Sequence, residues 1–118
     1  MKLLAPLTYY EAPQEMKDRV CNGCGPEGLL GKLVPEKLLG KCISPACNIH
    51  DWMYHEGIDK QKADLYFLAN MVLICSEGSK LLFPFRVALA CKFFLAVFYC
   101  GDEYFVIDDE ENDLRDVA

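Results

Sequence analysis

Hydrophobic residues recur at steps of three and four through the middle of the chain. Together with one asparagine they follow a single face of a helix: Ala63, Tyr66, Phe67, Asn70, Met71 and Ile74. Asp59 precedes this run and is a good N-cap, because its carboxylate can accept a hydrogen bond from a free N–H of the first turn. The pattern therefore predicts a helix that begins after Asp59 and is ended by Gly78.

A second helix is predicted directly before this one. Ser44 and Pro45 form a typical helix start, with serine as N-cap and proline at the first helical position, where its missing N–H costs nothing. The helix would run over residues 46–56 and stop at Gly57, since glycine readily adopts the left-handed conformation that ends helices. Only the short segment up to Lys60 joins the two helices, so we expect them to pack antiparallel.

The most apolar stretch of the chain runs from Leu81 to Tyr99. A membrane-spanning helix needs ~20 consecutive residues that are nearly free of charge. Pro84, Arg86 and Lys92 interrupt this stretch. We therefore predict a buried or interfacial helix from about Pro84 to Cys100, and no transmembrane span.

The remaining segments are less regular. Residues 1–20 are expected to form a loose N-terminal arm with a short helix around Gln14 to Val20. Residues 21–43 are rich in glycine and proline and predict a loop. Residues 108–118 form an acidic tail that we expect to be solvated and flexible. Residues 1–118 thus predict a single all-α domain, built from two antiparallel helices, a third apolar helix and a glycine-rich loop.

The charge balance narrows the classes of partner. The chain has a formal net charge of −6 and shows no basic stripe, which disfavours nucleic acid. It also disfavours purely electrostatic adsorption to an anionic membrane. Any lipid contact should then rely on apolar side chains or on a bound cation. The N-terminal apolar run is too short for a secretory signal, so we expect a cytoplasmic protein, or one released by a phage- or virus-associated route that uses no such signal.

The chain contains seven cysteines. An odd number cannot pair completely within one chain, so at least one thiol is free or intermolecular. In the absence of a secretory signal the default expectation is reduced thiols, because the cytosol keeps them so.

His50 and Asp51 stand side by side in the predicted helix 46–56, and Tyr54 follows one turn later. Residues four apart share a helix face, so His50 and Tyr54 should be neighbours, whereas Asp51 is rotated by ~100° from His50. A histidine base needs its second ring nitrogen held, usually by a carboxylate. Asp64 is the best candidate, because antiparallel packing brings it alongside His50. The pattern indicates a general base.

A glycine-rich segment, residues 23–28, precedes this helix. Its glycines permit unusual dihedral angles, and its carbonyl oxygens, with the Asp51 carboxylate, are ligands of the kind that calcium prefers. A cation held there could polarise an ester carbonyl while the neighbouring histidine deprotonates a water molecule. Ca²⁺ is therefore the predicted cofactor.

In combination these residues resemble the phospholipase A2 superfamily, above all its short bacterial, phage-associated and parvoviral branches. The resemblance covers about residues 20–75 and rests on the order C-G-x-x-G, then C-x-x-H-D-x-x-Y, then a helix beginning A-D-x-x-x-L. It implies a small phospholipase A2-like fold and calcium-dependent hydrolysis of the sn-2 ester of glycerophospholipids. The implied partner is phospholipid at a membrane or micelle interface.

The resemblance also implies roles for individual residues in catalysis. His50 matches the general base that activates water for attack on the ester. Asp51 matches the calcium-binding carboxylate. Asp64 and Tyr54 match the two side chains that orient the histidine.

For the loop, the resemblance implies a set of backbone donors. Gly23, Gly25 and Glu27 match the positions whose carbonyls bind calcium, and the amide of Gly25 would help to hold the oxyanion. Pro26-Glu27 stands where a glycine is common, so the third carbonyl is that of Glu27 or of Gly28.

The cysteines depart from the pattern of secreted members. Cys24 and Cys47 match a disulfide that joins loop to helix, and they are the implied pair if the environment is oxidising. Ala46 and Met53, however, stand where secreted members often have cysteines, so most of the disulfide framework is absent.

Two other interpretations remain. Cys21, Cys24, Cys42 and Cys47 could form a structural zinc site, which would make the chain a small binding module; this leaves the histidine and its partners unexplained. The chain could also be an inactive relative that binds lipid or protein. His55 lacks comparable support and is expected to be a surface residue.

Overall fold

The computed structural model of the chain describes residues 2–21, 34–57 and 59–100. The described part is mostly helical, as predicted, and adds a small two-stranded sheet. In chain order its elements are α1 (Leu7–Glu11), α2 (Gln14–Val20), β1 (Lys37–Leu38), β2 (Lys41–Cys42), α4 (Ser44–Glu56), α5 (Lys60–Ser76) and α6 (Phe83–Cys100).

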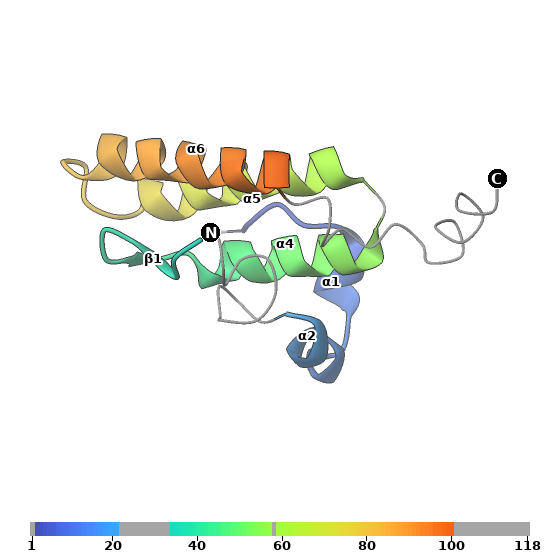
Figure 1. Cartoon of the computed structure of the whole chain (residues 1–118). Coiled ribbons are helices and arrows are strands. Elements are labelled where there is room, and N and C mark those ends of the chain that lie inside the picture. The colour runs from blue at the N-terminus through green and yellow to red at the C-terminus, as the bar shows by residue number, and fades with distance from the viewer. Residues whose placement is uncertain (1, 22–33, 58, 101–118) are drawn as a thin grey trace.

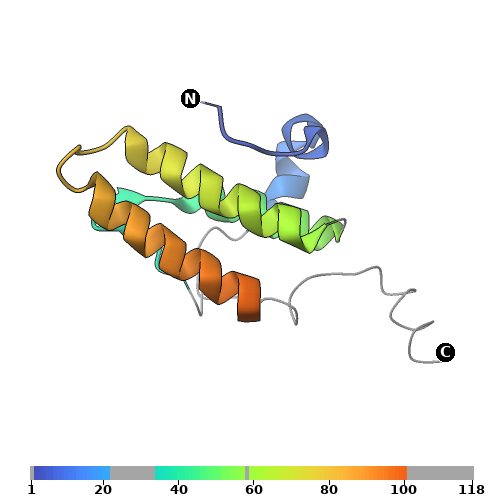
Figure 2. The same cartoon turned by 90° about the horizontal axis from the view of Figure 1, so that it is seen from above.

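The three long helices lie side by side and alternate in direction (Figures 1 and 2). Helix α5 is the central one, since it packs against both α4 and α6. The core lies between them and is formed by fully buried side chains, among them Ile43, Cys47, Phe67, Met71 and Val97. This alternation places the start of α5 beside the end of α6, which matters for the site.

Helix α4 ends as predicted but starts differently. Gly57 adopts a left-handed conformation with φ 66°, and its N–H donates to the carbonyl of Met53. At the other end Ser44 lies inside the helix, and the capping position is Ile43, without a side-chain cap. The Ser44 hydroxyl donates instead to Glu36 Oε1 at 3.1 Å. The prediction of Ser44 as N-cap is therefore wrong by one residue, because a carboxylate eight positions upstream competes for the hydroxyl.

Helices α5 and α6 agree with the sequence pattern. The Asp59 carboxylate accepts a hydrogen bond from the backbone N–H of Lys62 at 3.0 Å, which confirms the N-cap. Helix α5 ends at Ser76, two residues before Gly78, and α6 begins at Phe83. Among the described residues, no helix combines the length and the apolar character needed to cross a membrane.

The N-terminal segment contains helix α1 in addition to the short helix that we expected. Helix α2 has the predicted bounds, but α1 had no signal in the sequence pattern. The segment is attached to α5 through the buried side chain of Asn70, which accepts from the N–H of Leu4 at 2.7 Å and donates to its carbonyl at 2.8 Å. Tyr9 packs edge-on against Trp52 of α4. Trp52 is thus a packing residue.

Strands β1 and β2 form an antiparallel hairpin that the sequence analysis did not predict. Its two central residues, Leu39 and Gly40, both have positive φ angles, 47° and 87°. This is the geometry of the tight turns that suit the twist of a hairpin, and asparagine–glycine is its usual signal. Leucine rarely adopts a positive φ, so the turn needs support from elsewhere in the molecule.

That support comes from Arg86 of α6, which is 7% exposed. Its guanidinium donates to the carbonyl of Leu38 at 3.0 Å and to that of Leu39 at 2.6 Å. Hydrogen bonds from a charged donor are stronger than neutral ones. Arg86 therefore holds the hairpin against α6 and compensates for the strained turn.

We expect Arg86→Ala to lower the free energy of unfolding by about 2 kcal/mol, since it removes two charge-assisted hydrogen bonds from a buried position. Alanine and arginine are both good helix formers, so α6 itself should be little affected. Lys92→Ala, at an exposed position of the same helix, is the matched control and should change stability by less than about 0.5 kcal/mol. Urea unfolding measures both, and equal effects of the two substitutions would contradict this role of Arg86.

Candidate active site

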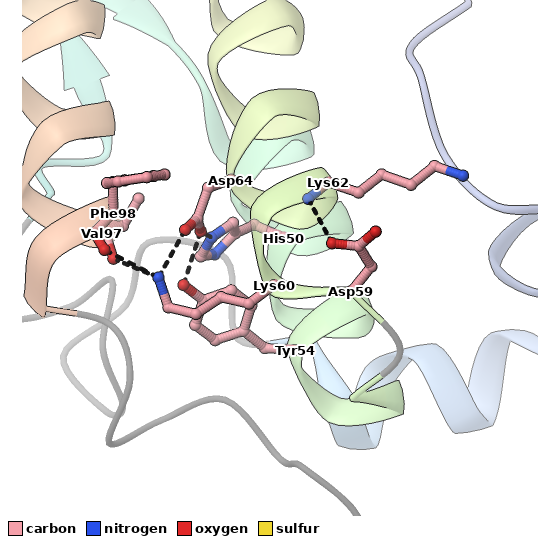
Figure 3. A network of polar contacts seen from close by, with 8 residues as sticks. All are labelled: His50, Tyr54, Asp59, Lys60, Lys62, Asp64, Val97 and Phe98. Atoms are coloured by element: carbon pink, nitrogen blue, oxygen red, sulfur yellow. Dashed lines mark hydrogen bonds and ion pairs between the residues drawn. The ribbon is translucent and has the colours of Figure 1, made fainter.

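The site is built where α4 and α5 face each other. His50 of α4 and Asp64 of α5 are both almost completely buried, and His50 Nε2 lies 2.8 Å from Asp64 Oδ1 (Figure 3). The antiparallel connection through Gly57 makes this pair possible, as the sequence predicted. The expected juxtaposition of His50 and Asp64 is thus present in the structure.

Tyr54 completes the group from the next turn of α4. Its hydroxyl donates to Asp64 Oδ1 at 2.6 Å, and its ring lies 4.1 Å, centre to centre, from the His50 imidazole. Phe67 packs on the same imidazole at 4.7 Å. The histidine ring is therefore restrained by aromatic side chains from both helices, and its orientation is set by packing as well as by hydrogen bonding.

Lys60 is a member of the site that the sequence analysis missed. Its ammonium lies 2.8 Å from Asp64 Oδ2 and also donates to the carbonyls of Val97 and Phe98 in α6 (Figure 3). The one signal in the sequence was the spacing of four residues between Lys60 and Asp64, which places both on the same helix face. The contact with α6 had no local signal.

The charge states follow from this geometry. Burial alone would raise the pKa of the Asp64 carboxyl, but hydrogen bonds from His50, Lys60 and Tyr54 lower it below its ordinary value. Burial lowers the pKa of His50, against the opposing effect of Asp64. Asp64 is therefore ionised and His50 neutral at pH 7. Since an ionised carboxylate only accepts hydrogen bonds, the His50 proton resides on Nε2.

The second nitrogen of His50 is consequently the one with a free lone pair. Nδ1 is buried and has no hydrogen-bond partner in the part of the chain that the structure describes. A buried polar atom without a partner is rare and calls for an explanation. An unprotonated imidazole nitrogen, oriented by a carboxylate on its far side, is suited to accept a proton from water or a hydroxyl group.

Asp51 lies on a different side of α4 from the His50–Asp64 contact, as its rotation around the helix predicts, and is half-buried. Its carboxylate is close enough to Cys21 to contribute, after burial, to raising the pKa of that thiol to about 11. Cys21 is the last described residue before the glycine-rich segment. Asp51 is thus a hard oxygen donor near the point where that segment begins, which fits the chemistry of a calcium ligand.

The other predicted calcium and oxyanion positions lie outside the described residues. These are Gly23, Gly25, Glu27 and the alternative Gly28. They stay predictions, as does the flexibility of the acidic tail, 108–118. Within the described ranges no three His, Cys, Asp or Glu side chains gather into a metal-binding group; a site of one carboxylate and several backbone carbonyls would not form such a group.

Cys47 departs from the default expectation of reduced thiols, because it is disulfide-bonded. Its predicted partner Cys24 lies outside the described residues, so that pairing stays a prediction. Cys21, which donates to the carbonyl of Asn48 at 3.2 Å, and the exposed Cys42 are free thiols. A disulfide sulfur is not the thiolate that zinc needs, so these positions give little support to the alternative zinc module.

His55, one residue after Tyr54, is exposed on α4. This agrees with its expected place on the surface and makes it a natural control for His50.

No family model matches the chain, and neither a curated protein nor a solved structure matches it significantly.

Proposed function

We propose that the chain is a phospholipase A2-like hydrolase that cleaves the sn-2 ester of glycerophospholipids with the help of calcium. The observation that carries the proposal is the state of His50: one ring nitrogen is bonded to Asp64, and the other is unpartnered among the described residues. The resemblance of the C-x-x-H-D-x-x-Y segment adds the substrate class. Together they favour water-mediated hydrolysis over a purely structural role.

In this reaction Nδ1 of His50 accepts a proton from the water that attacks the ester carbonyl. The imidazolium that forms lies against the ionised Asp64, which stabilises the new positive charge. Tyr54 holds the same carboxylate oxygen and keeps it directed at Nε2. Collapse of the tetrahedral intermediate expels the lysophospholipid alkoxide, which receives the proton back from His50.

Asp51 would hold the calcium ion, with the carbonyls of the glycine-rich segment as its further ligands. A bound calcium ion supplies Lewis-acid stabilisation of the oxyanion. The chain's own contribution at this position is a hard carboxylate on the residue next to the base.

The partner would be phospholipid in an aggregate. Large apolar side chains remain exposed along α6: Phe85, Leu95 and Tyr99. Lipid contact in so acidic a chain should rely on apolar groups, and these exposed side chains are suited to it.

The test is the release of fatty acid from mixed phospholipid vesicles. With calcium present we expect turnover, and an excess of calcium chelator should reduce it to background, because Asp51 and backbone carbonyls alone cannot replace the missing charge at the oxyanion. Restoring calcium should restore activity. Activity indifferent to the chelator would contradict the role of the metal, and stoichiometric zinc bound through thiolates would favour the small binding module. Vesicle binding without any turnover would indicate an inactive lipid-binding relative.

A further inference from the structure

The Lys60 ammonium connects the candidate active site to the third helix. It donates to Asp64 Oδ2 at 2.8 Å, to the carbonyl of Phe98 at 3.0 Å and to that of Val97 at 3.3 Å. An ammonium has three protons, so it can donate to all three of these acceptors at once. In Figure 3 the Lys60 side chain lies between the Asp64 carboxylate and the end of α6.

The three contacts satisfy groups that would otherwise be costly to bury. Asp64 accepts from His50 and Tyr54 on Oδ1, so Lys60 supplies the donor for its second oxygen. The carbonyls of Val97 and Phe98 belong to the last described turn of α6, where the helix dipole places partial negative charge. One cation therefore compensates two negative groups that belong to different helices.

The Lys60 ammonium also lies near two aromatic rings. It is 5.4 Å from the centre of the Phe98 ring and 5.9 Å from that of Tyr54, and the Lys60 side chain is only 17% exposed. A surface lysine samples many rotamers, whereas this one is restricted to a geometry that bridges α5 and α6. The position of the Asp64 carboxylate is thus linked, through Lys60, to the position of the last described turn of α6.

We propose that Lys60 is a positioning residue, which orients Asp64 and through it His50 by fastening the Asp64 carboxylate to the C-terminal end of α6. This rests on the proposed hydrolase function for its kinetic consequence. The physical link between Lys60, Asp64 and α6 stands apart from that function and can be tested without turnover. Lys60 does not touch the substrate in this scheme.

The kinetic test compares Lys60→Met with Lys62→Met. Lys62 lies on the same helix and is exposed, so its replacement removes the same charge without touching the site. We expect Lys60→Met to lower kcat about 10- to 100-fold, the usual effect of losing a partner that orients an active group. KM for vesicles should change less than about twofold, since substrate contacts are intact. Lys60→Arg should recover most of kcat, and Lys62→Met should behave as the unsubstituted protein.

The link itself is tested by a double-substitution cycle in urea unfolding. Lys60→Met, Asp64→Asn and the combination are compared, and we expect the two effects to be non-additive by about tenfold in the unfolding equilibrium constant. Lys60→Gln, which keeps a hydrogen-bond donor, replaces Lys60→Met if the latter does not fold. Additive effects would overturn the proposal, as would an unchanged kcat in folded Lys60→Met. The unsubstituted protein could show no turnover while the effects of the two substitutions on unfolding are non-additive. That result would refute the hydrolase function and support the link between Lys60 and Asp64.

Discussion

His50→Gln is expected to reduce fatty-acid release at least about a thousandfold, the upper part of the range for removing a general base. Glutamine is close to histidine in size, and its amide can donate to Asp64 as Nε2 does. It has no nitrogen that accepts a proton at neutral pH. The substitution therefore removes the base while it preserves the packing between α4 and α5.

His55→Gln is the control for this experiment. It makes the same chemical change five residues further along the same helix, at an exposed position, and should leave turnover within about twofold of the unsubstituted protein, as surface substitutions usually do. Both proteins should show the same helical circular dichroism. If folded His50→Gln kept more than a tenth of the activity, the general-base role of His50 would have to be abandoned.

The second large effect is expected at Asp64, where stability and activity can be separated. Asp64→Ala leaves the Lys60 ammonium and the Tyr54 hydroxyl without their buried acceptor, and should cost about 3–5 kcal/mol of unfolding free energy. Asp64→Asn keeps the shape and one acceptor oxygen, so it should cost less, about 1–3 kcal/mol. Activity should nevertheless be lost in both, because neither a methyl group nor an amide, which can both donate and accept, dictates which nitrogen of His50 carries the proton.

Asp59→Asn is the matched control for Asp64→Asn. It makes the same change at the exposed N-cap of α5, where asparagine caps as well as aspartate. Stability and turnover should both stay close to those of the unsubstituted protein. Urea unfolding and the vesicle assay together decide the outcome. Full activity in Asp64→Asn would contradict the orienting role of the carboxylate.

The pH dependence of stability gives a further check on Asp64. Its pKa is lower in the folded protein than in the unfolded chain, because the hydrogen bonds of His50, Lys60 and Tyr54 outweigh burial. The unfolded chain therefore takes up the proton first as the pH falls, and the contribution of Asp64 to stability is present above about pH 4 and is lost below it. The stability difference between the unsubstituted protein and Asp64→Asn should shrink correspondingly below about pH 4.

Much of the helical framework could be predicted from the chain alone. The bounds of α5 and the end of α4 follow from periodicity, from Gly57 and from the Asp59 cap, all of which act within a few residues. The contact of His50 with Asp64 and Tyr54 was predictable for the same reason. Two helices joined by a short connection must pack antiparallel, and helical spacing then determines which side chains meet.

Only the tertiary structure determines the contacts between residues that lie far apart in the sequence. Arg86 stabilises the turn at Leu39, which is 47 residues away, and Lys60 reaches Phe98 across 38 residues. Leu4 is held by Asn70 across 66 residues. No local pattern encodes these contacts, because each satisfies a backbone group whose need arises only once the helices have packed. The same holds for Nδ1 of His50: the sequence places a histidine beside an aspartate, and only the packed helices leave one nitrogen bonded and the other unpartnered among the described residues.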